Sequence, residues 1–412
     1  MASQSIQHYD SPHQFEPLLP GAHVVAPLLE MASDLTTASA RLPAGALAPH
    51  AGLRSLLRRM NSFYTNLIEG EHTRPSDIDR ALVKNFSANP DVARRQRLAL
   101  AHIGVEEQFE SDVDATSADL KQQRVWLYAP ETLCRIHGAM FASLPSEDLM
   151  LKDGSELQPG AIRTRQVAVG RHEAPLYSAV PAFLARWAEA YSSTPRGEST
   201  LLAIAASHHR LAWVHPFLDG NGRVARLHTH LALYSTGITR GFWSPLRGFA
   251  RTQDRYRELL QAADEHRRGA LDGRGNLSEK ALTEWIAYVL QTCADQANFM
   301  AAMLDPGNMK DRIAGCLQFE QSVLKDGARI EALHPLHHLF LTGSEMSRAE
   351  FKGLSQLGDR QATQLVSDLI RIGYLKTSSA YGPVSFGIPR RALRFYFPRL
   401  WPEAEADEDK TP

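Results

Sequence analysis

The stretch HPFLDGNGRVAR, residues 215–226, constrains the fold more than any other part of the sequence. Pro216 disfavours helix at the preceding residue, so a helix that reaches His215 must end there. The segment DGNG at 219–222 permits a tight turn, and a new helix is expected to begin at its end. The sequence therefore predicts two helices joined by a sharp loop, with backbone N–H groups of the second helix facing that loop.

Two arginines follow this loop at positions where the electrostatics oppose them. Arg223 and Arg226 fall near the start of the second helix, where the macrodipole is already positive. Their placement makes sense if the ligand is an anion with several charges. A helix N-terminus can hold one phosphate group, and guanidinium groups can hold the next ones. The loop is therefore predicted to bind a polyphosphate.

Two other residues of the loop have the chemistry that a transfer reaction on a polyphosphate needs. Asp219 is the only carboxylate in the loop, and Mg²⁺ binds through one or two carboxylates plus phosphate oxygens. His215, with an ordinary pKa of about 6.5, is suited to removing a proton from an incoming hydroxyl. The alternative is that these residues have only a structural role, in which His215 caps a helix and the glycines make a turn. That interpretation explains each feature singly but not their combination.

Length, charge and cysteine content limit the class of protein. A chain of 412 residues predicts two or three domains. The 45 Lys and Arg nearly cancel the 46 Asp and Glu, so no global field attracts nucleic acid or an anionic membrane. Cys134, Cys293 and Cys316 lack the spacing of a disulfide framework or a zinc module. Without a signal-peptide pattern or an apolar run of membrane length, we expect a cytoplasmic protein that does not bind membranes.

The apolar periodicity predicts a mainly α fold with one small hairpin. Residues 1–45 are expected to form an irregular lead-in, and the polar stretch 110–119 to separate two helices. The stretch GAIRTRQVAVG, residues 160–170, alternates like a short hairpin with Val167 and Val169 on one face. Helices are predicted over residues 53–68, 76–110, 130–144, 182–191, 201–214, 224–234, 252–267 and 277–304.

The character of the chain changes after the segment 305–308. Helix, turn, helix and two short β segments follow, an order that predicts a winged helix-turn-helix. The predicted division is an N-terminal helical region at 1–123, a core at 124–305, a winged helix at 306–400 and an acidic tail at 401–412. The presumed recognition helix and its flank carry polar residues suited to DNA, namely Arg360, Gln361, Thr363, Gln364 and Lys376. Its basic content is low, so protein docking or dimerisation is the alternative.

The residues of the loop match a known family. HPFLDGNGRVAR resembles the Fic signature, HPF-x-[DE]-GNGR-x-x-R, at every fixed position, with Ala225 where many relatives have glycine. The stretch 160–170 is similar to the substrate-positioning flap of that family, and 255–264 to the helix after the motif. The likeness covers about residues 125–290. It implies an all-helical Fic core with a small β-hairpin flap, and transfer of AMP from ATP to Tyr, Ser or Thr hydroxyls of a target protein.

The resemblance also implies roles for single residues. His215 corresponds to the catalytic base and Asp219 to the Mg²⁺ ligand. Residues that would bind ATP are Gly220, Asn221, Gly222 and Arg223 around the α-phosphate, Arg223 and Arg226 at the β- and γ-phosphates, and Tyr256 beside the adenine. Self-modification and a homodimer are further expectations. The cofactors expected are ATP as substrate and Mg²⁺.

A second short motif precedes the core. The residues TNLIEG at 65–70 resemble the inhibitory motif [ST]-x-x-x-E-[GN] of Fic proteins of the second class. Glu69 is expected at the C-terminal end of its helix, where the dipole disfavours a carboxylate by up to about 1 kcal/mol. The alternative is that Glu69 is a solvated surface residue without a functional role. By the resemblance, Glu69 pairs with Arg226, occupies the γ-phosphate position and holds ATP in an unproductive pose.

Other functions stay open at this point. The same scaffold could remove AMP, with Glu69 activating water, or transfer another phosphate-containing group. The chain could also be a DNA-binding regulator whose nucleotide site acts as a sensor. A transition-metal cluster among His208, His209, His215, His228 and His230 is disfavoured, because no thiolate joins them and the helical pattern makes His208 a buried, hydrogen-bonded residue. His334, His337 and His338 are expected in a loop.

Overall fold

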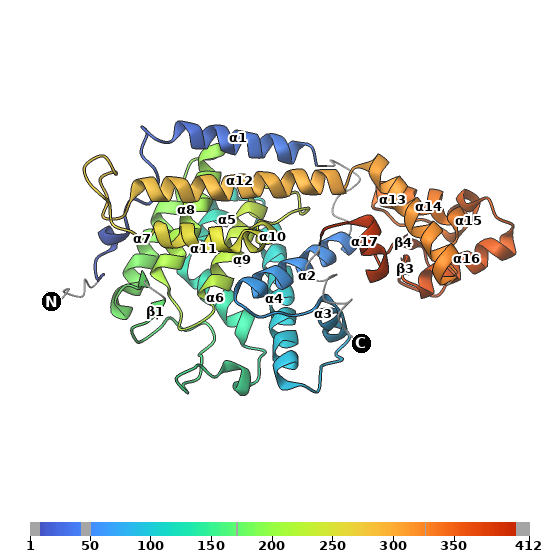
Figure 1. Cartoon of the computed structure of the whole chain (residues 1–412), viewed down its shortest axis with the longest axis horizontal. Helices are drawn as coiled ribbons and strands as arrows, with labels where there is room; N and C mark the ends of the chain where they lie inside the picture. The colour runs from blue at the N-terminus through green and yellow to red at the C-terminus, as the bar shows by residue number, and fades with distance from the viewer. Residues whose placement is uncertain (1–8, 43–50, 170–171, 326, 401–412) are drawn as a thin grey trace. The chain divides into compact units, whose positions relative to one another are not determined.

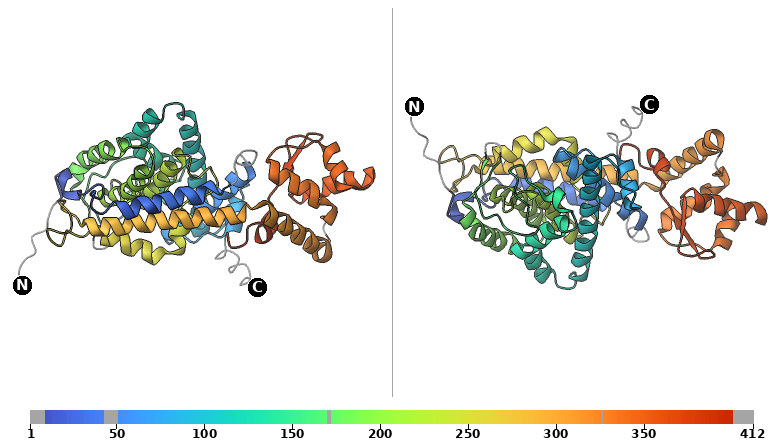
Figure 2. Two further views of the ribbon diagram at one scale, coloured as in Figure 1. Left: turned by 90° about the horizontal axis from the view of Figure 1, so that it is seen from above. Right: turned by 90° about the horizontal axis from the view of Figure 1, so that it is seen from below.

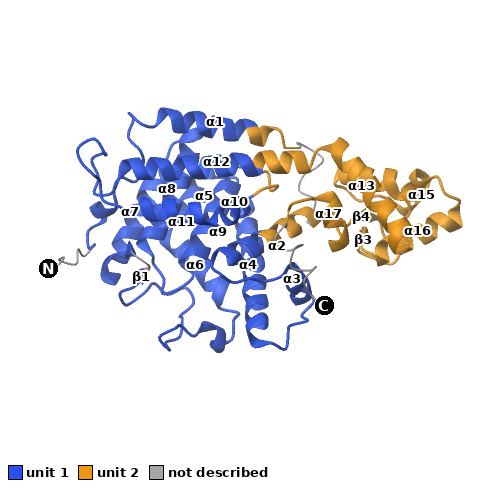
Figure 3. Ribbon diagram, viewed as in Figure 1, with its two compact units in different colours: residues 1–37, 61–239, 244–296 blue, residues 38–60, 240–243, 297–412 orange. Residues whose placement is uncertain are grey.

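A computed structural model describes residues 9–42, 51–169, 172–325 and 327–400 of the chain. It divides into two compact units (Figure 3). Unit 1 comprises residues 1–37, 61–239 and 244–296, and unit 2 comprises residues 38–60, 240–243 and 297–412. The predicted boundaries of the helical region, core and winged helix remain a prediction. The predicted acidic tail, 401–412, lies outside the described residues.

The fold is mainly helical, as predicted (Figure 1). The helices up to the end of the long helix α12 are α1 (Ala26–Ala40), α2 (Ala51–Ile68), α3 (Pro75–Leu82), α4 (Pro90–Ala115), α5 (Leu120–Leu127), α6 (Pro130–Phe141), α7 (Val180–Ser192), α8 (Glu198–Val214), α9 (Asn221–Ser235), α10 (Leu246–Arg251), α11 (Gln253–Ala262) and α12 (Glu279–Met303). None of the helices among the described residues is long and apolar enough to cross a membrane.

Helix α8 is the centre of unit 1. It packs against α7 and α9, and α4 packs against α9 from another direction. The backbone of α8 accepts hydrogen bonds from two buried indoles, Trp187 Nε1 to Ser207 O at 3.0 Å and Trp285 Nε1 to Ala205 O at 2.7 Å. The loop that follows α8 is therefore attached to a helix whose residues from Leu201 to Val214 are almost all buried.

Helix α1 lies where an irregular lead-in was predicted, and it runs alongside α12 (Figures 1 and 2). Leu28, Ala32 and Leu35 are buried at helical spacing. The periodicity was hidden in the sequence because alanines occupy much of the buried face. Residues 1–8 and 43–45 of the predicted lead-in lie outside the described residues.

Helix α4 continues through part of the stretch that was predicted to break it. The helix ends at Ala115, and its N-terminus is capped by Asn89, whose side chain accepts hydrogen bonds from two backbone N–H groups. Phe109 and Val113 extend the buried face into the polar stretch. Glu110 is buried as well, so an acidic residue in this sequence does not mark the surface.

The predicted hairpin is present but is shorter and lies further along the chain. Strands β1 (Ala168–Val169) and β2 (His172–Glu173) are antiparallel, with Ala168 opposite Glu173. Most of the stretch predicted to alternate, up to Val167, has no regular secondary structure. Its last residue, Gly170, lies outside the described residues. The alternating pattern of residues predicted a strand wrongly here, because the residues before Ala168 are held by side-chain contacts described below rather than by a strand partner.

In unit 2 a series of short helices is followed by an antiparallel hairpin. The helices are α13 (Pro306–Phe319), α14 (Leu333–Thr342), α15 (Arg348–Ser355), α16 (Asp359–Arg371) and α17 (Leu393–Tyr396), and the antiparallel strands are β3 (Leu375–Thr377) and β4 (Val384–Phe386). Ser347 and Glu350 form a capping box at the start of α15. Met346 exchanges two backbone hydrogen bonds of 2.8 Å with Val384, which extends the hairpin by one bridge.

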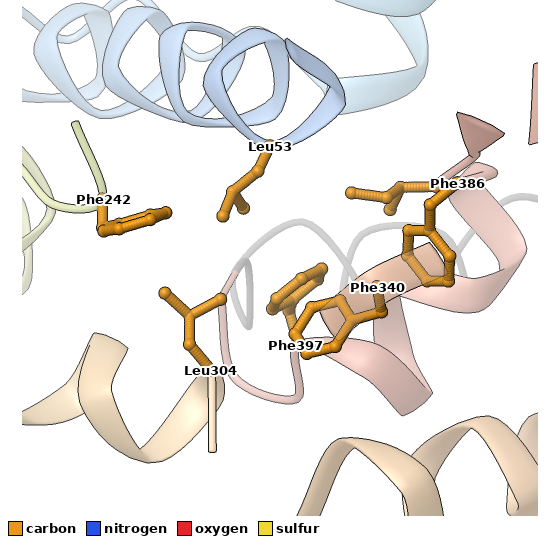
Figure 4. Close-up of a pocket in the computed structure, with 7 residues that line it drawn as sticks. Leu53, Phe242, Leu304, Phe340, Phe386 and Phe397 are labelled. Atoms are coloured by element: carbon orange, nitrogen blue, oxygen red, sulfur yellow. The ribbon is translucent and has the colours of Figure 1, made fainter. Parts of the chain in front are cut away.

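The core of unit 2 is aromatic. A small pocket in it is lined only by apolar side chains (Figure 4), which are Leu53, Phe242, Leu304, Phe340, Phe386, Ile388 and Phe397. One expectation for this unit is wrong, since His334, His337 and His338 belong to helix α14 rather than to a loop. Residues 306–308 start α13, with Asp305 as its cap. Contact of α16 with DNA remains a prediction, with protein docking or dimerisation as the alternative.

The turn between α8 and α9 depends on two residues in the left-handed region. His215 has φ 50° and ψ 63°, and Gly220, directly before α9, has φ 79°. A Cβ atom on Gly220 would lie 2.6 Å from Cε2 of Phe141. Glycine is therefore required there both by backbone conformation and by space.

Gly220→Ala is expected to destabilise unit 1 by about 1–3 kcal/mol, since it adds a clash with a buried ring to the strain of a positive φ. Gly154→Ala is the matched control, because Gly154 has φ 83° and no neighbour within 4 Å of its Cβ position. The midpoint of thermal unfolding should fall by at least about 2 °C more for Gly220→Ala than for Gly154→Ala. Equal shifts would show that the contact with Phe141 does not matter.

Candidate active site

The loop that joins α8 to α9 is closed by the side chain of Asn221, the first residue of α9. The Oδ1 of Asn221 accepts a hydrogen bond of 2.9 Å from the N–H of Phe217, and its Nδ2 donates to Phe217 O at 2.8 Å. Asn221 was predicted to bind ATP. In the structure the amide of Asn221 faces the loop backbone, and the residue is 5% exposed. Asn221 therefore shapes the predicted phosphate site, while the backbone N–H groups of α9 line that site.

His137, in helix α6, packs against the loop, and the sequence alone did not identify this residue. Its ring stacks on Phe217 with 4.0 Å between centroids. Its Nδ1 accepts from the N–H of Gly160 at 2.8 Å, and its Nε2 lies 3.2 Å from the carbonyl oxygen of Asp219. Burial lowers the pKa of His137 to about 4. The neutral ring, with its proton on Nε2, therefore satisfies both contacts at neutral pH.

Arg163 is the second residue that the sequence did not reveal. Its buried guanidinium donates from Nε to His215 O at 2.8 Å and from Nη2 to Pro175 O. Its own N–H donates to Pro216 O at 2.9 Å. Burial lowers the pKa of Arg163 to about 10, so the group stays charged at neutral pH. Nothing in the sequence distinguishes it from Arg165, which is exposed.

His215 lies at the end of α8 with its backbone held by Arg163. Burial lowers the pKa of its imidazole to about 4, and the nearby His172 acts in the same direction. The ring is thus neutral at pH 7 and can accept a proton. His172 is itself fixed by a contact of 2.7 Å between its Nε2 and Trp213 O.

The start of α9 has the properties of an anion site. Its first turn contains no acidic residue. Arg223 is 5% exposed, and its Nε and Nη1 have no hydrogen-bond partner in the described part of the chain. Its guanidinium lies over the ring of Phe141 at 5.2 Å, and Nη2 is 3.7 Å from Asp219 Oδ2. Buried guanidinium donors without partners are costly, and an anionic ligand would satisfy them.

Asp219 is the exposed member of the loop. Its side chain is 51% accessible, and Oδ1 accepts a hydrogen bond of 2.7 Å from the N–H of Gly220. The carboxylate thus lies at the open edge of the anion site. One carboxylate beside phosphate oxygens is a donor set that Mg²⁺ accepts.

Arg226 is paired with a residue from the end of α2. Its guanidinium donates to the hydroxyl of Thr65 at 2.8 Å and to Thr65 O at 3.2 Å, and it forms an ion pair with the Glu69 carboxylate. Arg226 is 1% exposed, whereas the Glu69 side chain is 33% accessible. Desolvation favours the protonated acid, but the charges of Arg226 and Arg223 outweigh it and lower the pKa of Glu69.

The Glu69 carboxylate also covers the start of α9. A Cβ atom at Gly222 would contact Glu69 Oε1 and would lie 3.0 Å from Arg226 Nη1. The carboxylate therefore occupies the positive end of the helix. An anion is favoured at that place, and here the chain itself supplies it.

The end of α2 is fixed by helix α11. The carbonyl of Ile68 accepts hydrogen bonds from Gln253 Nε2 at 3.0 Å and from Arg257 Nη2 at 2.7 Å. These donors satisfy a carbonyl at the C-terminus of α2, and the charge of Arg257 offsets its negative dipole. Gln253 and Arg257 thus hold Glu69 at the site, and sequence reasoning did not identify them.

Tyr256, predicted beside the adenine, is buried close to Arg226. It is 3% exposed, and its hydroxyl is 2.9 Å from His208 Nε2. The nearby charge of Arg226 acts on this hydroxyl against the effect of burial, which raises the pKa of Tyr256. His208 is buried, and its Nδ1 lies 2.7 Å from the hydroxyl oxygen of Thr229, so its ring links Tyr256 to Thr229. This confirms the prediction of a buried, hydrogen-bonded histidine.

Comparison with known proteins places this loop in a family context. Residues 127–233 match the Fic/DOC family. The chain is 30% identical over 112 residues to Protein adenylyltransferase Fic of Drosophila yakuba (26% of this chain, 21% of that protein). It is 34% identical over 94 residues to Protein adenylyltransferase fic-1 of Caenorhabditis elegans (22% of this chain, 18% of that protein). The chain thus spans about a fifth of the length of these curated relatives.

A solved structure supports the fold. The crystal structure of a Fic family protein from Desulfovibrio desulfuricans aligns over 92% of this chain and 98% of that chain, with a TM-score of 0.51 and 16% sequence identity. The likeness at this identity concerns the fold alone. The stretch from residue 127 to residue 233, which contains the whole α8–α9 loop, is the part of the chain that resembles the Fic/DOC family.

Proposed function

We propose that this chain is a protein adenylyltransferase that transfers AMP from ATP to a hydroxyl of a target protein and is restrained by its own Glu69. The observation that carries the proposal is the carboxylate of Glu69 on Arg226 at the N-terminus of α9. A site that holds an internal anion in this way is built for an external one. The similar proteins from Drosophila yakuba and Caenorhabditis elegans, both named protein adenylyltransferase, support the reaction class.

The ligand is a polyphosphate because one negative charge does not satisfy the site. Glu69 pairs with Arg226, yet Nε and Nη1 of Arg223 still have no partner among the described residues. A triphosphate would place one group on the backbone N–H groups of α9 and others on the two guanidinium groups. Its terminal phosphate and Glu69 would compete for Arg226. That competition is the proposed restraint.

The neutral imidazole of His215 is the proton acceptor in the transfer. Its side chain takes the proton of the target hydroxyl while the hydroxyl oxygen bonds to the α-phosphorus. The bond from that phosphorus to the oxygen bridging to the β-phosphate breaks, and pyrophosphate leaves. Arg163 keeps the His215 carbonyl, and with it the start of the loop, in place. Backbone N–H groups at the start of α9 stabilise the charge that develops on the phosphate.

Asp219 would hold Mg²⁺ at the open edge of this site, together with phosphate oxygens. When bound, the ion would neutralise phosphate charge and help pyrophosphate to leave. The exposed carboxylate, with Arg223 3.7 Å away on one side, fits that role.

Glu69→Gly is expected to raise AMP incorporation, including self-modification, by at least about tenfold, because breaking a charge-assisted contact worth about 1.5–3 kcal/mol frees Arg226 for ATP. The measurement is transfer of label from ATP radiolabelled at the α-phosphate, with intact-mass analysis for a gain of one AMP per site. Glu71→Gly is the control, because Glu71 pairs with Arg94 instead.

Equal labelling of the wild type and Glu69→Gly would remove the restraint from Glu69. Absence of AMP transfer by Glu69→Gly, with ATP still bound, would favour a nucleotide sensor. Loss of AMP from a premodified target with wild-type protein, and not with Glu69→Gly, would favour removal of AMP.

The rate of the Glu69→Gly form is expected to stay constant from about pH 8 to pH 6 and to fall only as the pH approaches about 4. The sign follows from the lowered pKa of His215, since the base form persists to more acidic solution. A histidine with the ordinary pKa would lose about three-quarters of its base form by pH 6. The measurement is the initial rate at saturating ATP, with His215→Ala as the inactive reference. A half-maximal rate near pH 6.5 would contradict the assignment.

A further inference from the structure

Unit 1 contains a buried cluster of carboxylates and imidazoles that the proposed reaction does not use. His102, Glu106 and Glu110 are spaced four residues apart on one face of α4, and His230 faces them from α9. Their exposed fractions are 1%, 1%, 6% and 4%. Acidic side chains are seldom buried in this way unless they are paired or bind a metal.

The distances within the cluster suit a metal ion. Nε2 of His230 lies 3.0 Å from an oxygen of Glu110 and 3.6 Å from an oxygen of Glu106. One donor atom from each of these three residues lies within 4.8 Å of the others. Two ligands of a tetrahedral zinc ion, each at about 2.0–2.2 Å from the metal, are roughly 3.3–3.6 Å apart. The cluster is thus already close to ligand spacing.

His102 is an independent indication of a ligand. Its Nδ1 points into the cluster, 3.5 Å from Oε2 of Glu106. Although the side chain is 1% exposed, neither ring nitrogen has a hydrogen-bond partner in the part of the chain that the structure describes. A buried imidazole with two unpartnered nitrogens, one of them directed at a carboxylate, is placed as a metal ligand would be.

Asn61 orients one of the carboxylates. Its Nδ2 donates a hydrogen bond of 2.7 Å to Oε1 of Glu106, and Asn61 is 1% exposed. Hydrogen bonds of this kind fix the orientation of ligating side chains and raise metal affinity. The set of two imidazoles and two carboxylates favours a transition-metal ion over Mg²⁺ or Ca²⁺, which prefer oxygen ligands alone.

We propose that His102, Glu106, Glu110 and His230 bind one divalent transition-metal ion, Zn²⁺ by ligand type, in the interior of unit 1. The ion would link α4 to α9, the helix whose start carries Arg223 and Arg226. It is separate from the Mg²⁺ site at Asp219, because His230 lies roughly 15 Å further along the chain direction of α9. The alternative for the same residues is a closed hydrogen-bond network in which a protonated His230 bridges the two carboxylates.

Metal uptake by the untagged full chain tests the proposal without reference to AMP transfer. After removal of metals with a chelator, the wild type should take up one equivalent of Co²⁺, with the visible absorption bands of a four-coordinate site, and Zn²⁺ should displace it. The midpoint of thermal unfolding should rise with Zn²⁺. His230→Gln should weaken Co²⁺ binding by at least about tenfold. Glu107→Gln, on the exposed face of α4, should bind as the wild type does.

Two further variants keep the result interpretable. Should His230→Gln not fold, His102→Gln, which leaves three ligands, takes its place and should show the same direction of change. Asp219→Ala should retain full Co²⁺ uptake, which separates this site from the one at the loop. The proposal is overturned if folded wild-type protein takes up no stoichiometric metal, or if His230→Gln and His102→Gln both bind Co²⁺ as tightly as the wild type.

Discussion

The positive start of α9 is the constraint on which the arrangement of unit 1 depends. A sharp loop delivers the chain to this helix without an acidic residue in its first turn, and two arginines follow. Such a helix end is unfavourable until a negative charge reaches it. In this structure that charge comes from Glu69, at the end of a helix whose own dipole is relieved when the carboxylate meets Arg226. Each of the two unfavourable helix ends thus stabilises the other.

The same constraint explains why so much of unit 1 is devoted to holding short segments in place. Arg163 and His137 fix the loop from the region before the hairpin and from α6. Gln253 and Arg257 fix the end of α2 from α11. An anion site works by fixed dipoles, and a loop that could relax would lose the advantage over water. A metal bridge between α4 and α9 would add rigidity to the same helix.

Helix α1 and the polar stretch after Phe109 are places where the structure differs from what the sequence predicts. Helix α1 was missed because its buried face is rich in alanine, which contributes little to an apolar pattern. The polar stretch after Phe109 remained helical because Glu110 is buried in the cluster with His230, whereas acids are ordinarily read as surface residues. Tyr256 was expected at the nucleotide from the resemblance of its helix to the helix after the Fic motif. Its side chain is buried, and its hydroxyl lies 2.9 Å from His208 Nε2.

The sequence by itself determined the break after α8, since Pro216 and the glycines restrict the backbone wherever the chain is placed. It also determined the chemical types present at the loop, namely an imidazole, a carboxylate and two guanidinium groups. Only the tertiary structure decided which distant residues meet them. Arg163, His137 and Glu69 precede His215 by more than 50, 70 and 140 positions, respectively, and local periodicity carries no information about such contacts. The pairing of Glu69 with Arg226 was expected only from the resemblance to Fic proteins. Packing buries His215, which keeps its imidazole neutral, and brings His230 to Glu110, and neither effect follows from the local sequence.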